Sequence, residues 1–119
     1  MGLRYSFSTM QPDNKNKYQL VFTTCPNEAV AEKIALALVQ EKIAACANIV
    51  PGVKSIYRWQ GKIEQYNEAL LLIKSDIGHY GRLEKRIQAL HPYELPEILA
   101  VTLDSGAKAY LNWITTCLD

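Results

Sequence analysis

The feature that most constrains this chain is a long β-hairpin expected between Ala45 and Ser75, with its turn at Gln60-Gly61. β-Branched and aromatic residues are abundant in both arms, which is typical of strands. Each arm has about 12 residues and would be roughly 40 Å long at about 3.3 Å per residue. The helices predicted on either side have about 14 residues each and would be only about 21 Å long. Because such helices cannot cover the whole hairpin, we expect its outer half to be covered from elsewhere or to be exposed to water.

The hairpin itself is predicted to have two parts of different character. Pro51-Gly52 interrupts the first arm and predicts a kink or bulge, because proline lacks a backbone donor and glycine weakens a strand. Residues 69–73 are apolar on both faces, as in a central strand. Residues 61–68 are mixed, as in an exposed or inter-subunit strand. The sheet is therefore expected to have a buried root and a different outer half.

The remaining elements surround this hairpin in the order β-α-β-β-α-β plus a terminal helix. Asn27 and Asp76 are suitable N-caps for the two main helices, and Pro92 ends the second of them. This order predicts an α+β, ferredoxin-like fold with both main helices on one face of a four-stranded antiparallel sheet. The predicted elements are a strand over residues 18–24, a helix over 28–42, the hairpin, a helix over 77–90, a core strand over 97–103 and a helix over 107–118.

Length and composition predict one soluble domain. The chain has 119 residues, which we divide into a flexible N-terminal segment over residues 1–17 and a single domain over residues 18–119. A net charge of +1 does not favour a nucleic-acid partner, and no apolar run is long enough to cross a membrane. The three cysteines form no C-x-x-C pair, which argues against a disulfide framework and a structural zinc site. We therefore expect reduced thiols and a cytoplasmic location.

The segment from His91 to Glu97 carries the strongest chemical signal, since it holds a histidine, a tyrosine and two carboxylates between the end of a helix and the start of a strand, and its two prolines stiffen it. Rigid histidine and glutamate side chains could bind copper or zinc, or could transfer protons. The alternative is a proline-rich connector with solvated or helix-capping side chains. Cys25 could approach this loop, because the first and last strands are neighbours in the expected fold. The alternative for Cys25 is a small, half-buried apolar side chain.

A second group of candidates lies on the hairpin. Tyr57, Trp59 and Tyr66 flank its far end and could stack on nucleic-acid bases, although that use normally comes with a basic groove. An inter-subunit contact is favoured, because tryptophan and tyrosine are enriched at interfaces. Lys74 lies at the inner end of the second arm and could bind an anion or be solvated. The sequence contains no phosphate-binding, dinucleotide-binding, zinc-protease or serine-hydrolase motif.

Four motifs, in order and with matching spacing, resemble the CutA divalent-cation-tolerance proteins over residues 18–119. They are TTCPNEAVAEKIA, EKIAACANIVPGVKSIYRWQGKIEQ, LLIKS and LHPYELPEIL. The resemblance implies a ferredoxin-like subunit, related in shape to PII signal proteins, in a homotrimer whose long hairpins wrap neighbouring subunits. It also implies a role in tolerance of copper and other divalent cations, without a defined enzymatic activity.

The resemblance further implies a metal site. Its ligands would be Cys25, His91 and Glu97, with Cu(II) or another divalent cation bound but not obligatory. In some members the cysteine lies two residues earlier, at the position of Thr23. Such a shift keeps the side chain on the same face of the strand but moves it by about 7 Å.

Our leading hypothesis is therefore a cytoplasmic, non-enzymatic homotrimer that binds divalent metal weakly and serves metal tolerance. The alternative is a PII-like sensor that binds a small anionic ligand between subunits, with Trp59, Lys74 and Tyr93 in the pocket. A third interpretation is an RNA-recognition module, which shares the topology. It is disfavoured because the third strand lacks the aromatic-rich RNP1 pattern.

Overall fold

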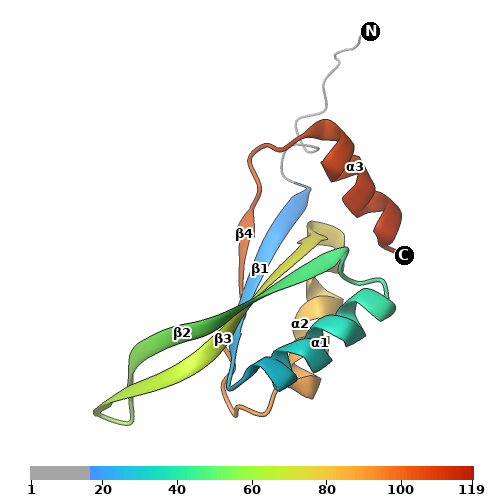
Figure 1. The fold of residues 1–119 in the computed structure, drawn as a ribbon. Coiled ribbons are helices and arrows are strands. Elements are labelled where there is room, and N and C mark those ends of the chain that lie inside the picture. The colour runs from blue at the N-terminus through green and yellow to red at the C-terminus, as the bar shows by residue number, and fades with distance from the viewer. Residues whose placement is uncertain (1–16) are drawn as a thin grey trace, which may run out of the picture.

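The computed structural model describes residues 17–119, whose strands and helices follow the predicted β-α-β-β-α-β order with a terminal helix (Figure 1). Apart from Lys17, the expected flexible segment over residues 1–17 lies outside the described residues. The elements are β1 (Tyr18–Cys25), α1 (Glu28–Gln40), β2 (Cys46–Trp59), β3 (Lys62–Asp76), the 3-10 helix η2 (Ile77–His79), α2 (Tyr80–Leu90), β4 (Leu99–Thr102) and α3 (Lys108–Cys117).

The four strands form one antiparallel sheet in the order β2-β3-β1-β4, which confirms the ferredoxin-like prediction. Side chains alternate across the sheet, so every second residue of β1 and β3 faces the two main helices. Val21, Leu71 and Ile73 are fully buried on that face. The helices meet them with their own apolar stripes, which contain Ala31, Ile34 and Leu38 in α1 and Leu83 and Ile87 in α2.

The long hairpin is confirmed, and its outer half has no third strand beside it (Figure 1). β2 has 14 residues and β3 has 15, whereas β1 reaches only as far as Ala69 of β3. Gln60 and Gly61 turn the chain with φ angles of 50° and 81°, as a two-residue type I′ turn requires. Ile56, Ile63 and Tyr66 are exposed in this outer half. The mismatch between long strands and short helices is therefore real.

A β-bulge interrupts β2 at the predicted place. The pairing passes from Val50 opposite Leu70 to Val53 opposite Glu68, so one extra residue is inserted at Pro51-Gly52. Gly52 has a φ of 70°, which a residue with a side chain rarely adopts. A bulge bends a strand and changes the direction of nearby side chains. It lies opposite the point where β3 leaves the core.

The caps of the main helices are also confirmed, with one correction. Asn27 Oδ1 accepts a hydrogen bond of 2.9 Å from the amide of Val30, and Asp76 Oδ1 accepts one of 3.1 Å from the amide of His79. The second helix, however, does not begin as an α-helix at Ile77. Its first residues form η2, and α2 follows from Tyr80. Gly78 lies in this turn, and glycine weakens the start of an α-helix.

The prediction of a core strand over residues 97–103 is wrong in length and in burial. β4 contains only four residues, all of them exposed. It is an edge strand that pairs with β1 alone, and the loop containing Pro92 and Pro96 occupies the residues before it. Apolar sequence alone did not distinguish an uncovered edge strand from a buried one.

The sheet face opposite α1 and α2 is apolar too, and we call it the open face. By the strand register it presents side chains from all four strands. Its apolar side chains from β4 and Val50 of β2 are exposed, and its apolar side chains from β1 and β3 are partly buried. The apolar residues of the open face are Leu20, Phe22, Val50, Leu70, Leu72, Leu99 and Val101.

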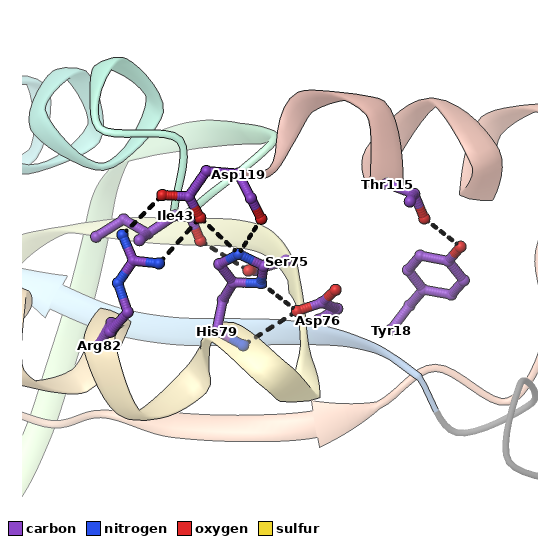
Figure 2. Close-up of polar contacts among 8 residues, drawn as sticks. All are labelled: Tyr18, Ile43, Ser75, Asp76, His79, Arg82, Thr115 and Asp119. Atoms are coloured by element: carbon purple, nitrogen blue, oxygen red, sulfur yellow. Dashed lines mark hydrogen bonds and ion pairs between the residues drawn. The ribbon is translucent and has the colours of Figure 1, made fainter.

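The C-terminal helix α3 lies at the end of the sheet away from the hairpin tip (Figure 1). Its Ile114 is fully buried in a small cluster with Tyr18 and Ala45. The hydroxyls of Tyr18 and Thr115 lie 2.7 Å apart and form a hydrogen bond between β1 and α3 (Figure 2).

The last residue of the chain, Asp119, is held by the start of the second helix (Figure 2). Its carboxylate accepts hydrogen bonds of 2.9 and 3.0 Å from Arg82, and its Oδ1 lies 3.0 Å from Nε2 of His79. Nδ1 of His79 lies 2.6 Å from Asp76. Partial burial alone would lower the pKa of His79, but the hydrogen bonds to Asp76 and Asp119 raise it. Hydrogen bonds from Arg82 and His79 lower the pKa of Asp119 to about 2.

Candidate functional site

A groove of about 920 Å³ lies between the hairpin and the loop that joins α2 to β4. Side chains of β2 and β3 form one side, and the loop and the end of β1 form the other. Within residues 17–119, four carboxylates and one arginine line it, so these side chains give it a negative charge. The lining residues are Thr24, Pro26, Ser55, Ile56, Tyr57, Arg58, Trp59, Glu64, Tyr66, Glu68, Tyr93, Glu94, Leu95, Pro96 and Glu97.

Glu68 is the buried polar residue of this groove, with only 5 % of its surface exposed. The hydroxyl of Tyr93 donates a hydrogen bond of 2.5 Å to its Oε2. The sequence did not single out Glu68, because it reads as one polar residue in a mixed strand. The available signal was its place directly before the apolar run over residues 69–73 and close to the expected bulge.

The negative charge of Glu68 affects its neighbours. Burial and the hydrogen bond to Glu68 raise the pKa of Tyr93. The pKa of Tyr57 is raised by burial and by the charge of Glu68. Both phenols are therefore protonated at neutral pH, and Tyr93 is fixed as a donor toward the carboxylate.

His91, the first predicted metal ligand, lies beside the groove and does not line it. Its Nε2 donates a hydrogen bond of 2.8 Å to the carbonyl of Thr24, and its Nδ1 accepts one of 3.2 Å from the amide of Tyr93. A carbonyl can only accept, so this pattern corresponds to a neutral ring with its proton on Nε2. The ring also packs against that of Tyr93, at 4.7 Å between centroids. In this arrangement both ring nitrogens already have partners.

Cys25, the second predicted ligand, ends β1 as expected, but its side chain points into the helix-covered core. It is fully buried, whereas its neighbours Thr24 and Pro26 line the groove. Burial, with a smaller contribution from the charge of Glu68, raises the pKa of the thiol to about 11. Thr23, two residues earlier, is buried on the same face, and its hydroxyl has no hydrogen-bond partner within the described part of the chain.

Glu97, the third predicted ligand, is exposed and lines the groove. The described residues contain no group of three or more His, Cys, Asp or Glu side chains that could hold a metal ion. Cys25, His91 and Glu97 therefore lie near the same end of β1, but their side chains do not converge on one point as metal ligands do.

The residues predicted for an anionic ligand are divided. Trp59 and Tyr93 line the same groove. Lys74 does not, because it lies six residues along β3 from Glu68, which corresponds to about 20 Å. Its Nζ donates a hydrogen bond of 2.7 Å to Asn48 on the neighbouring strand.

No helix within residues 17–119 is long and apolar enough to cross a membrane.

Comparisons with known proteins agree with this architecture. The chain is 49% identical over 96 residues to the divalent-cation tolerance protein CutA of Thermus thermophilus, an alignment that covers 81% of this chain and 93% of that protein. The chain is also 43% identical over 93 residues to human protein CutA. This alignment covers 78% of this chain and only 52% of that protein. The chain thus spans about half the length of the human relative.

A solved structure and a family model extend the comparison. The crystal structure of CutA from Xylella fastidiosa superposes with a TM-score of 0.84 at 49% identity, and the match covers 86% of this chain and 98% of that one. The model of the family described as CutA1 divalent ion tolerance protein matches residues 19–117. The sequence, the fold and these matches agree, and the chain belongs to the CutA1 divalent ion tolerance protein family.

Proposed function

We propose that this protein is a homotrimer that binds copper, or another divalent cation, weakly and serves metal tolerance. The observation that carries the metal proposal is the hydrogen bond between His91 Nε2 and the carbonyl of Thr24. This hydrogen bond holds the His91 imidazole at the end of β1, at the residue directly before Cys25. Imidazole and thiolate are ligands that suit copper.

The negative groove beside this point supports a cation as the ligand. Glu64, Glu68, Glu94 and Glu97 raise the local concentration of cations, and Arg58 is the one cationic side chain of the described residues that lines the groove with them. Glu97 belongs to the same loop as His91 and is exposed, so its carboxylate is available to a metal.

The hydrogen bonds of the site explain why binding would be weak. A metal on His91 must displace either the Thr24 carbonyl from Nε2 or the Tyr93 amide from Nδ1. Cys25 would also have to lose its proton against a pKa raised to about 11. Both requirements make the free energy of metal binding less favourable.

The open face supports the trimer. An antiparallel sheet that faces water normally has polar residues on its outer side, whereas this one carries Leu20, Phe22, Leu70 and Leu72. An apolar surface of this kind marks an interface. Other copies of the chain would cover the open face.

The edges of the sheet support a closed ring of subunits. β2 and β4 are the two edge strands, and both are largely exposed. Pairing of β2 in one copy with β4 in the next is a head-to-tail contact, which gives a ring when its rotation closes. The long hairpin would then reach along a neighbouring subunit.

The metal proposal is tested by isothermal titration of Cu(II) into the wild type and the His91→Ala variant. We expect His91→Ala to bind Cu(II) about tenfold more weakly, as is typical when one ligand or its support is lost. His79→Ala is the matched control, because it removes the other of the two histidines. Equal affinity in the wild type and His91→Ala would remove His91 from the site. Loss of binding in His79→Ala alone would place the metal at the group formed by Asp76, His79, Arg82 and Asp119, which we call the C-terminal cluster.

The trimer is tested separately by multi-angle light scattering, which should give about three times 13.4 kDa. A Leu72→Glu change puts a charge in the centre of the open face and should lower that mass. A monomeric wild type would contradict the trimer proposal and would leave the metal proposal to be decided by the titration.

The anionic-ligand alternative receives less support. Lys74 is bonded to Asn48 and lies away from the groove, and the carboxylates of the groove repel anions. We also propose binding rather than catalysis, and a cytoplasmic location, which rests on the odd number of cysteines.

A further inference from the structure

We propose that the groove between the hairpin and the loop after α2 binds a small organic ammonium ion, with Glu68 as its anionic partner. This inference goes beyond the proposed metal function. The groove shares Glu97 with the proposed metal site, but neither Cys25 nor His91 lines it. It rests on three features: a buried carboxylate with one available oxygen, aromatic walls, and the size of the cavity.

The first feature is the carboxylate of Glu68, which is 95% buried and still lines the groove. Its Oε2 accepts the hydrogen bond from Tyr93, whereas no hydrogen bond from residues 17–119 reaches Oε1. A buried carboxylate is costly unless its oxygens are paired. An N–H donor from a ligand at Oε1 would complete the pairing, and a charged donor would form the stronger bond.

The second feature is the set of aromatic rings around this carboxylate. Tyr57, Trp59, Tyr66 and Tyr93 all line the groove. The rings of Tyr57 and Tyr66 lie 6.1 Å apart between centroids. Aromatic faces attract cations within about 6 Å of the ring centre, and tryptophan and tyrosine are the best of them. Anions gain nothing from such walls.

The third feature is size. A volume of about 920 Å³ lies within the usual range of small-molecule sites, about 300–1,000 Å³. Ile56, Leu95 and Pro96 add apolar surface to the lining. A bare metal ion would leave most of this surface unused, whereas an alkyl or aryl ammonium ion fills it with its apolar body and places its charge at Glu68.

The test is isothermal titration of n-hexylammonium into the full chain at pH 7, where the amine is charged. We expect saturable binding by the wild type. 1-Hexanol, which has the same apolar body without the charge, should bind about tenfold more weakly or not at all. Binding of the alcohol as tight as that of the amine would overturn the proposal, because it would make the groove an apolar site only.

Two variants locate the binding. Glu68→Gln keeps the shape of the side chain but removes its charge and should weaken hexylammonium about tenfold or more. Tyr57→Leu leaves Glu68 and the core intact and should weaken it about two- to fivefold through the lost cation–π contact. Should Glu68→Gln fail to fold, Tyr57→Leu still tests the groove. Wild-type affinity in either folded variant contradicts the assignment.

A control variant and an optical readout complete the design. Glu32→Gln makes the same change in net charge on the exposed side of α1, outside the groove, and should leave the affinity within about twofold. Trp113→Phe leaves Trp59 as the only tryptophan, so its emission should shift on binding.

A neighbouring copy of the chain is the competing occupant of the groove. In that case the wild type would not bind hexylammonium, and Glu68→Gln would lower the oligomer mass measured by light scattering. That pair of results would overturn the proposal and assign the groove to the subunit interface.

Discussion

The hydroxyl of Tyr93 lies 2.5 Å from Oε2 of Glu68 and joins the loop after α2 to the hairpin. Glu68 pairs with Val53, directly after the bulge, where β3 leaves the core and enters the uncovered outer half. His91 fixes the same loop to β1 through Thr24. The loop that carries Glu97 is therefore fixed to two strands, and these two contacts shape the groove.

Loss of the Tyr93 hydroxyl should destabilise the fold. We expect Tyr93→Phe to lower the free energy of unfolding by about 1–3 kcal/mol, because it leaves a buried carboxylate without its donor. Chemical denaturation at one fixed protein concentration measures this, since assembly affects apparent stability. Tyr66→Phe is the control, because Tyr66 is exposed and its hydroxyl bonds to no residue in the described range. Equal losses in the two variants would show that the hydrogen bond contributes nothing.

The Cys25 thiol should be the least reactive of the three. It is fully buried and its pKa is raised to about 11, so almost no thiolate forms at pH 8. Cys46 and Cys117 are partly exposed. Labelling with a thiol reagent at pH 8, followed by peptide mass spectrometry, should modify Cys25 only after unfolding. Fast labelling of Cys25 in the native protein would mean that the end of β1 opens readily.

The C-terminal cluster should stabilise the protein within a limited pH window. The pKa of His79 is raised above 6.5, so its contribution is complete below about 6.5 and is lost as the pH rises through the higher folded value. The pKa of Asp119 is lowered from 3.8 to about 2, so its contribution is complete above about 3.8 and is lost as the pH falls toward 2. The cluster is therefore strongest between about pH 4 and 6.5.

Thermal melts of Asp119→Asn across pH check this window. The loss in Tm relative to the wild type should be largest between these limits and smaller on both sides. Asp104→Asn is the control, since Asp104 is exposed and no salt bridge joins it to another described residue. A pH-independent loss in Asp119→Asn would show that charge is not the cause.

Two glycine substitutions should have opposite effects. Gly61→Ala should lower the free energy of unfolding by about 1 kcal/mol, because its φ of 81° is strained for alanine. Gly81→Ala should raise it by about 0.5–1 kcal/mol, because Gly81 is in α2 and has space for a methyl group. Denaturant titration measures both. A gain in Gly61→Ala would contradict the assigned turn.

The local features of this chain could be predicted because each depends on neighbours in sequence. Asn27 and Asp76 cap the helices that follow them, and Gln60-Gly61 forms the tight turn that its residue types favour. The bulge at Pro51-Gly52 follows from a missing donor and a permissive backbone. The excess length of the hairpin over its helices follows from the number of residues in each element and the rise per residue in strands and helices.

The candidate site was predicted only in part. The sequence predicts a polar loop from His91 to Glu97 that Cys25 could approach, and His91 does contact β1 at Thr24. The direction of each side chain does not follow from the sequence. His91 is fixed by a hydrogen bond to a residue 67 positions away. A side chain at the end of a strand can lie on either face of the sheet, and that of Cys25 lies on the face covered by the helices.

The sequence by itself thus determined the order of elements, their caps, the turn, the bulge and the excess length of the hairpin, since these depend on local backbone preferences and on alternation. Only the tertiary structure decided that β4 is an exposed edge, that Lys74 is remote from the groove, and that Glu68 is the buried carboxylate within it. The physical reason is that burial and pairing depend on which strands are neighbours and in what register, and that is set by contacts between residues far apart in the chain.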